Sequence, residues 1–88
     1  EETPWIEFML IDKYLIKKEF KKALALALEL NNHKLSSQNG AKLLYMKSEI
    51  YRNMKNITKQ KYLLEECANK KIDSKWKTLC KKMLLTVK

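Results

Sequence analysis

Apolar residues recur along this chain at the three- and four-residue spacing that places them on one face of an α-helix. Polar breaks divide the pattern into five stretches, at about residues 4–17, 19–30, 38–54, 57–70 and 74–87. One Gly and one Pro leave little turn chemistry for a β-rich fold. The pattern therefore predicts an all-α chain of about five helices arranged as antiparallel hairpins.

Residues that favour helix starts precede four of these stretches. The candidate N-caps are Thr3, Ser36 or Ser37, Asn56 or Thr58, and Asp73 or Ser74. Pro4 follows Thr3 directly and suits the first helical position, where its missing N–H costs nothing. In the second stretch, Ala23 and Ala27 share a face, and their small side chains allow a neighbouring helix to approach closely.

The first stretch is unusual because apolar residues point in nearly every direction around its helix. Only Glu7, Asp12 and Lys13 interrupt them. A helix that is apolar all round needs cover on more than one side, so we expect either an upstream repeat or a partner on its bare flank. The chain also opens without Met and without a signal-peptide pattern, so we interpret it as the C-terminal part of a longer protein.

Three polar residues, Lys47, Ser48 and Gln60, fall within apolar stripes. Lys47 lies in the stripe of the third helix, where we expect its stem to pack while its ammonium group reaches water. Gln60 lies near the centre of the fourth helix's stripe, where burial requires hydrogen-bond partners. The longest wholly apolar run has six residues, Ala23 to Leu28, and a spanning helix needs about 20. We therefore expect no transmembrane segment.

The net charge of +9 is uneven, because residues 1–44 carry +1 and residues 45–88 carry +8. A basic half indicates nucleic acid, an anionic surface or an acidic protein as a partner. However, 18 of the 19 basic residues are Lys, whereas phosphate sites favour the planar fork of Arg. The excess of Lys over Arg is typical of the codon usage of an AT-rich genome. Solvated surface charge, with no dedicated anionic partner, is therefore the favoured interpretation.

No arrangement of residues indicates catalysis, a cofactor or a metal. His33 is the single histidine, and no nucleophile and orienting group accompany it in a recognisable pattern. Cys67 and Cys80 are too few for a structural zinc site, which needs four ligands. They fall on facing stripes of the last two helices. Two buried thiols are the favoured interpretation, and a disulfide is the alternative if the Cα atoms lie within about 7 Å.

A weak repeat runs through the chain. Tyr14, Tyr51 and Met83 lie late in the first helix of successive units, at offsets of 37 and 32 residues. Trp76 and Leu79 form a W-x2-L pattern. The sequence thus resembles a degenerate tetratricopeptide repeat, whose period is about 34 residues. Another α-hairpin repeat and a plain helical bundle are the alternatives. The resemblance implies stacked hairpins in a right-handed superhelix within a single domain at 1–88. Repeat one would lie at about 4–32, repeat two at about 37–71 and a capping helix at about 73–87.

The resemblance also implies that the first helix of each repeat lines a binding groove. The groove would be apolar and aromatic at the N-terminal end and basic at the other, which suits a partner helix or an extended peptide with an acidic end. Lys42 is one groove-facing position. The partner-binding residues implied in this way are Trp5, Phe8, Asp12, Leu15, Tyr45, Glu49, Arg52, Asn53, Lys77 and Lys81.

We therefore expect a non-enzymatic scaffold that docks a partner protein or neighbouring repeats, with no cofactor. The lysine-rich, arginine-poor composition suggests a bacterial protein, and we expect a role in a cell-envelope, periplasmic or flagellar-motor assembly. Nucleic-acid or anionic-surface binding through the C-terminal half is the alternative function. Self-association through the first helix is a further possibility for the partner.

Overall fold

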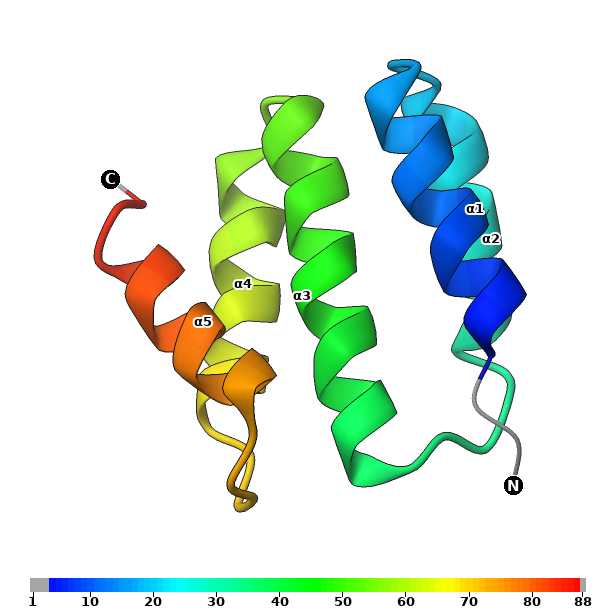
Figure 1. Ribbon diagram of the computed structural model, residues 1–88. Helices are drawn as coiled ribbons and strands as arrows, with labels where there is room; N and C mark the ends of the chain where they lie inside the picture. The colour runs from blue at the N-terminus through cyan, green and yellow to red at the C-terminus, as the bar shows by residue number, and fades with distance from the viewer. Residues whose placement is uncertain (1–3, 88) are drawn as a thin grey trace.

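The computed structural model describes residues 4–87, and within that range it contains five α-helices and no strand (Figure 1). The helices are α1 (Trp5–Ile16), α2 (Phe20–Leu30), α3 (Ser37–Asn53), α4 (Ile57–Ala68) and α5 (Lys75–Leu84). Short connections make antiparallel hairpins of α1–α2 and α3–α4, and α5 packs against both helices of the second hairpin. The prediction of an all-α fold with stacked hairpins is confirmed.

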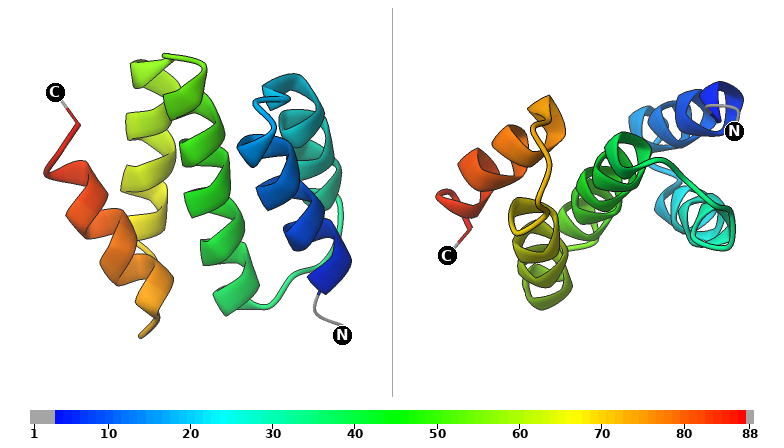
Figure 2. Two further views of the ribbon diagram at one scale, coloured as in Figure 1. Left: turned by 45° about the horizontal axis from the view of Figure 1, so that its top comes forward. Right: turned by 90° about the horizontal axis from the view of Figure 1, so that it is seen from below.

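The helices form two layers. Seen end-on, α1, α3 and α5 lie in one layer, and α2 and α4 lie in the other (Figure 2). The N-termini of α1, α3 and α5 all lie at the same end of the molecule (Figure 1). The first helix of each unit therefore contributes to one continuous surface of the protein.

Side-chain caps start three of the helices where the sequence predicted them. Ser36 Oγ accepts the N–H of Asn39 at 3.1 Å, and Asn56 Oδ1 accepts the N–H of Lys59 at 3.1 Å. Ser74 caps α5 in the same way, through the N–H of Trp76 at 3.1 Å. Pro4 is the residue before α1 rather than its first helical residue. The predicted cap Thr3 lies outside the described residues.

The two hairpins turn in the same way. Lys18 and Lys55 each adopt a left-handed conformation with φ of 61°. The residue after each lysine donates its backbone N–H to the carbonyl of Tyr14 at 2.8 Å and of Tyr51 at 2.9 Å, respectively. This bond across six residues is the Schellman motif that closes helix C-termini. The turns repeat at the 37-residue offset of the two tyrosines.

The interior consists of two apolar clusters, one between the hairpins and one beneath α5. The first core cluster joins α1, α2 and α3 through Phe8, Ile11, Ala23, Ala27, Leu30, Leu43, Met46 and Ile50. The second core cluster joins α3, α4 and α5 through Ala41, Leu44, Leu63, Leu64, Cys67 and Cys80. Helix α3 contributes to both clusters because apolar residues lie on two of its sides, so it is the central helix of the fold.

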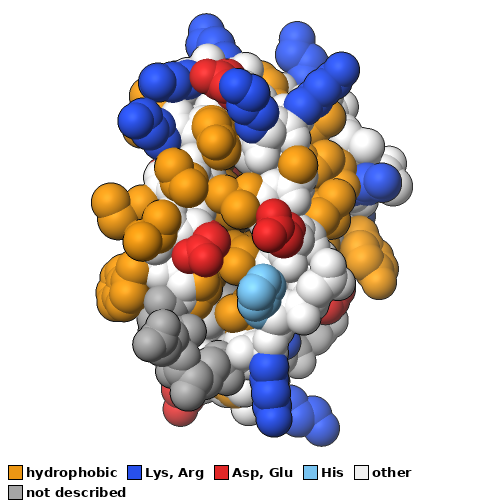
Figure 3. Space-filling model, turned by 90° about the vertical axis from the view of Figure 1, so that its right-hand side faces the viewer, with side chains coloured by type: hydrophobic (Ala, Val, Ile, Leu, Met, Phe, Trp, Pro, Cys, Tyr) orange, Lys and Arg blue, Asp and Glu red, His pale blue; other side chains and the backbone are white. Residues whose placement is uncertain are grey.

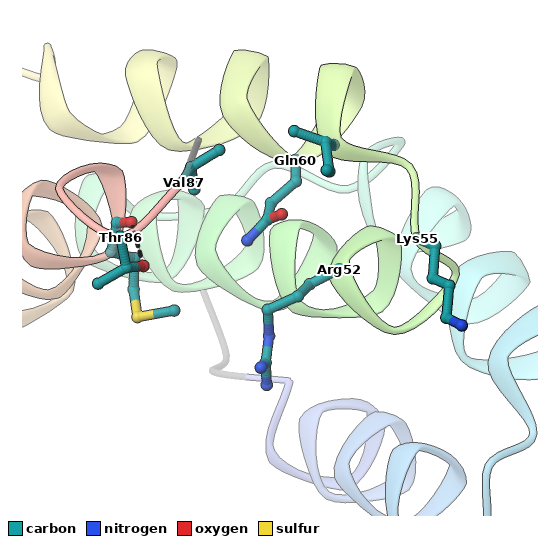
Figure 4. A pocket seen from close by; sticks show the side chains of 7 residues that line it. Arg52, Lys55, Gln60, Thr86 and Val87 are labelled. Carbon is teal, nitrogen blue, oxygen red and sulfur yellow. Dashed lines mark hydrogen bonds between the residues drawn. The ribbon is translucent and has the colours of Figure 1, made fainter.

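All three polar residues predicted within apolar stripes, Lys47, Ser48 and Gln60, are buried. Lys47 Nζ donates to Asn31 Oδ1 at 3.0 Å, and burial lowers the pKa of Lys47. Its ammonium group thus has a side-chain partner on the neighbouring hairpin. Gln60 is 5% exposed, and its amide points into a surface pocket (Figure 4). The amide of Gln60 therefore borders an open pocket, which the sequence did not reveal.

A disulfide joins α4 to α5. Cys67 and Cys80 have Sγ atoms 2.06 Å apart and Cα atoms 6.0 Å apart. The favoured interpretation of two separate buried thiols was therefore wrong, and the alternative holds. The physical reason is that α5 packs directly on α4, which brings the two apolar stripes within bridging distance.

Candidate docking surface

Helix α1 leaves most of its apolar side chains in solvent. Phe8 and Ile11 are buried in the first core cluster. The remaining large apolar residues of its outer side are exposed. They are Trp5 at 66%, Ile6 at 70%, Met9 at 67%, Leu10 at 36% and Ile16 at 81%. We refer to these five residues as the α1 apolar face.

The members of the α1 apolar face lie on one side of the helix. At about 100° per residue, the five residues fall within an arc of roughly 140°. Lys13 falls inside this arc and Asp12 falls just beyond its edge, and both are exposed. Figure 3 views the side of the molecule formed by α1 and α2, where hydrophobic side chains gather across the middle and Lys and Arg lie mainly toward the ends. A contiguous apolar surface of this kind marks an interaction site more often than it marks ordinary surface.

Helix α5, at the opposite end of the fold, has the contrasting pattern. Trp76, Cys80 and Met83 face the second core cluster, while Lys81 and Lys82 are exposed. One side of α5 is therefore apolar and the other basic, which suits a helix that closes a stack and faces water. The two ends of the molecule thus differ in chemistry: one is apolar and the other is charged.

An aromatic and cationic cluster crosses the layer of α1, α3 and α5. Lys42 Nζ lies 4.4 Å from the ring centre of Phe8, 5.3 Å from that of Trp76 and 5.9 Å from that of Trp5. Tyr45 contacts Trp76 at 5.7 Å between ring centres. Cation–π contacts of this kind contribute about 0.5–2 kcal/mol each, depending on exposure. Lys42 therefore links all three helices of the layer.

The predicted residues at the far end of α3 form a polar network. Glu49 accepts from Tyr45 Oη at 3.1 Å and from Arg52 Nε at 2.6 Å. Asn53 Nδ2 donates to the carbonyl of Glu49 at 2.8 Å. Burial, together with the nearby charge of Glu49, raises the pKa of Tyr45. Three of these side chains bond to one another and the fourth bonds to the backbone of Glu49, so a partner would meet them as an ordered surface.

The structure separates the predicted groove residues into two groups. Trp5, Asp12 and Lys81 are exposed, and Lys77 is half-buried, so a partner can reach them. The second group consists of Phe8, which is buried, and Leu15, which is half-buried.

Phe8 and Leu15 are less accessible than the resemblance implied. Phe8 is 2% exposed and lies beneath Lys42, and Leu15 packs against the first core cluster. The spacing of apolar residues alone does not say which side of α1 faces its neighbours. Ile6, Met9 and Leu10 are exposed apolar residues of α1 that the sequence did not single out.

A pocket of about 540 Å³ lies beside the second hairpin turn (Figure 4). It is formed by α3, α4 and the C-terminal residues. Its lining residues are Arg52, Lys55, Ile57, Gln60, Met83, Thr86 and Val87. Gln60 and Arg52 point toward it from two different helices, while Lys55 points away. The lining combines two cationic residues, one amide and one hydroxyl with apolar groups, and it contains no carboxylate and no histidine.

No protein-family model matches this sequence, and neither does any curated protein. Across residues 4–87, no helix has the length and apolarity to cross a bilayer. In the same part of the chain, His, Cys, Asp and Glu side chains form no cluster of three or more that would suit a metal ion. The surface itself therefore carries the functional argument.

Proposed function

We propose that this chain is a non-enzymatic scaffold module that docks a partner helix, an extended peptide or neighbouring repeats during assembly of a larger complex. The observation that carries the proposal is the α1 apolar face. Burying a large apolar side chain contributes about 1.5–3 kcal/mol. Five such side chains on one helix would therefore provide a substantial driving force for association.

The hairpin architecture supports the same function. Stacked hairpins hold each exposed residue in a fixed position, and repeat proteins bind through such extended surfaces. The shared turns at Lys18 and Lys55 support a repeated unit, and with it a tetratricopeptide-like interpretation of the chain. The disulfide between Cys67 and Cys80 supports a location in an oxidising compartment, such as a bacterial periplasm.

The proposal is tested by capturing proteins from the source cell with the immobilised chain. The informative variant is Trp5→Ala with Met9→Asp, because both side chains are largely exposed and their change leaves the core intact. Phe8 is kept, because truncating a buried Phe costs about 3–5 kcal/mol and would unfold part of the chain. A matched control is Leu85→Asp, which changes an exposed apolar residue at the opposite end.

We expect one or more proteins to bind the native chain and the Leu85→Asp control but not the double variant. Binding should persist at high salt, because apolar burial is insensitive to screening. Equal capture by the native chain and the double variant would contradict the proposal.

Anionic-surface binding is the second candidate function, and the distribution of charge favours it. The described residues contain two ion pairs, Lys22 with Glu19 and Arg52 with Glu49, so the α5 lysines have no such pairing within residues 4–87. Binding to a DNA duplex that engages several lysines should weaken by orders of magnitude between about 50 and 200 mM salt. Affinity for DNA that is unchanged over this range would exclude the second function.

A further inference from the structure

The two turns fix a residue-by-residue correspondence between the hairpins. Lys18 and Lys55 share both their left-handed conformation and their hydrogen-bond pattern, and they lie 37 residues apart. Each residue of α1 can therefore be compared with the residue 37 positions later in α3. The comparison shows which side of α1 another hairpin would contact if it packed against α1 as the first hairpin packs against α3.

The second hairpin docks on the first through one side of α3. Leu43, Met46 and Ile50 are buried there, in the same cluster as Ala23 and Ala27 of α2. Both alanines are fully buried, and their small side chains allow α3 to approach α2. The docking side of α3 thus presents large apolar residues, and the α2 residues buried in the same cluster are Ala23, Ala27 and Leu30, two of them small.

Three of the four corresponding positions on α1 are apolar, and all four are exposed. The correspondence pairs Ile6 with Leu43, Met9 with Met46, Leu10 with Lys47 and Lys13 with Ile50. Ile6 and Met9 are 70% and 67% exposed, whereas their counterparts are 3% and 4% exposed. At Ile6 and Met9, α1 therefore exposes apolar side chains where α3 buries apolar side chains against the first hairpin.

We infer that the α1 apolar face receives a helical hairpin whose second helix presents small residues, in the arrangement by which α3 rests on α2. This inference rests on the proposed function and specifies the partner of that site. A second copy of this chain is a poorer occupant, because its own Ala23 and Ala27 are already fully buried in the first core cluster. An extended peptide would not use the helical spacing of Ile6, Met9 and Leu10.

Lys13 defines a further property of the partner. It stands where the fully buried Ile50 stands in α3. Lys47 shows how this kind of interface accommodates a lysine, since its ammonium group donates to Asn31 Oδ1 at the end of α2. The hairpin that docks on α1 should therefore place a carboxylate or amide oxygen within reach of Lys13.

A tandem protein tests the docking arrangement directly. A copy of residues 1–37 joined ahead of residue 1 of the full chain restores the 37-residue spacing and supplies an alanine-faced second helix. A second tandem protein carries Lys13→Ile in the inner α1, which reproduces Ile50 and removes any need for a polar partner. Amide hydrogen exchange of the inner α1 is then compared with that of the native chain.

We expect exchange in the inner α1 to slow by about tenfold or more in at least the Lys13→Ile tandem protein, because docking must open before those amides exchange. Met9→Asp in the inner copy should abolish this protection, and Leu85→Asp should preserve it. Unchanged exchange in both tandem proteins would overturn the inference. Sedimentation of the native chain as a dimer that Met9→Asp dissociates would overturn it in favour of a second copy.

The two proposals fail separately. If the tandem protein is protected but cellular capture finds no partner, the arrangement of docking stands and the proposed function fails. If capture succeeds through Met9 but neither tandem protein is protected, the docking site stands and its occupant is not a hairpin of this kind.

Discussion

At the residue scale, the two hairpin turns contain a conformational cost that substitution can remove. Lys18 and Lys55 adopt φ of 61°, where a side chain with a Cβ is disfavoured and Gly is not. We expect Lys18→Gly and Lys55→Gly each to raise the unfolding free energy by about 0.5–1 kcal/mol, offset in part by the greater freedom of the unfolded chain. Urea denaturation checks this. The matched control is Lys21→Gly inside α2, which should destabilise by about 1 kcal/mol; stabilisation there would contradict the explanation.

The second prediction at the residue scale concerns how Lys47 makes stability depend on pH. Its pKa is lowered by burial, so the unfolded state binds the proton more tightly than the folded state. The folded state is therefore penalised below the folded pKa, and the penalty disappears as pH rises toward the ordinary value of about 10.5. Tyr45 acts in the opposite direction, because its raised pKa gives stability that is lost above about pH 10.

Lys47→Met should isolate the lysine contribution. We expect the variant to be more stable at neutral pH by about 1 kcal/mol, because an apolar stem replaces a buried charge and the exposed Asn31 can bond to water. The difference from the native chain should shrink as pH is raised toward that of an unfolded lysine. Urea denaturation at several pH values measures it, and a gap that stays constant with pH would contradict the assignment.

At the element scale, α5 depends on its covalent link to α4. A disulfide spanning a 13-residue separation stabilises a chain by about 3 kcal/mol, mainly through the unfolded state. We expect Cys67→Ala with Cys80→Ala to lower the unfolding free energy by about this amount. Hydrogen exchange in α5 should accelerate more than exchange in α1 and α2, which share the first core cluster. Reaction of both cysteines with a thiol reagent in the native protein without reductant would show that no bridge forms.

The same elements show how much the sequence could predict. Helix number and starts follow from local patterns, and Ser36, Asn56 and Ser74 were recognisable as caps because capping involves only a few adjacent residues. The orientation of α1 could not be predicted in that way, since it depends on which neighbours cover it. The same holds for the disulfide, which depends on how closely α5 approaches α4. The 37-residue offset between Tyr14 and Tyr51 was the available signal for the docking residues, because it aligns each α1 position with a buried one in α3.

At the scale of the whole molecule, the distribution of charge predicts how stability responds to salt. The chain carries a net charge of +9, and the described residues contain two ion pairs, both near the surface. Mutual repulsion of the lysines should therefore outweigh attraction, and screening should relieve it. We expect the urea midpoint to rise as sodium chloride is raised from about 20 to about 200 mM, a range over which the Debye length falls severalfold.

The identity of the anion separates general screening from a specific site. If screening alone acts, sodium chloride and sodium sulfate at equal, low ionic strength should raise the midpoint equally, because the Debye length depends on ionic strength alone. A larger effect of sulfate at millimolar concentration would indicate an anion-binding site, and its loss in Lys81→Gln with Lys82→Gln would locate that site on α5. Equal effects of the two salts, combined with salt-resistant capture through Met9, would assign the basic end of the molecule to keeping the protein soluble and the α1 apolar face to binding.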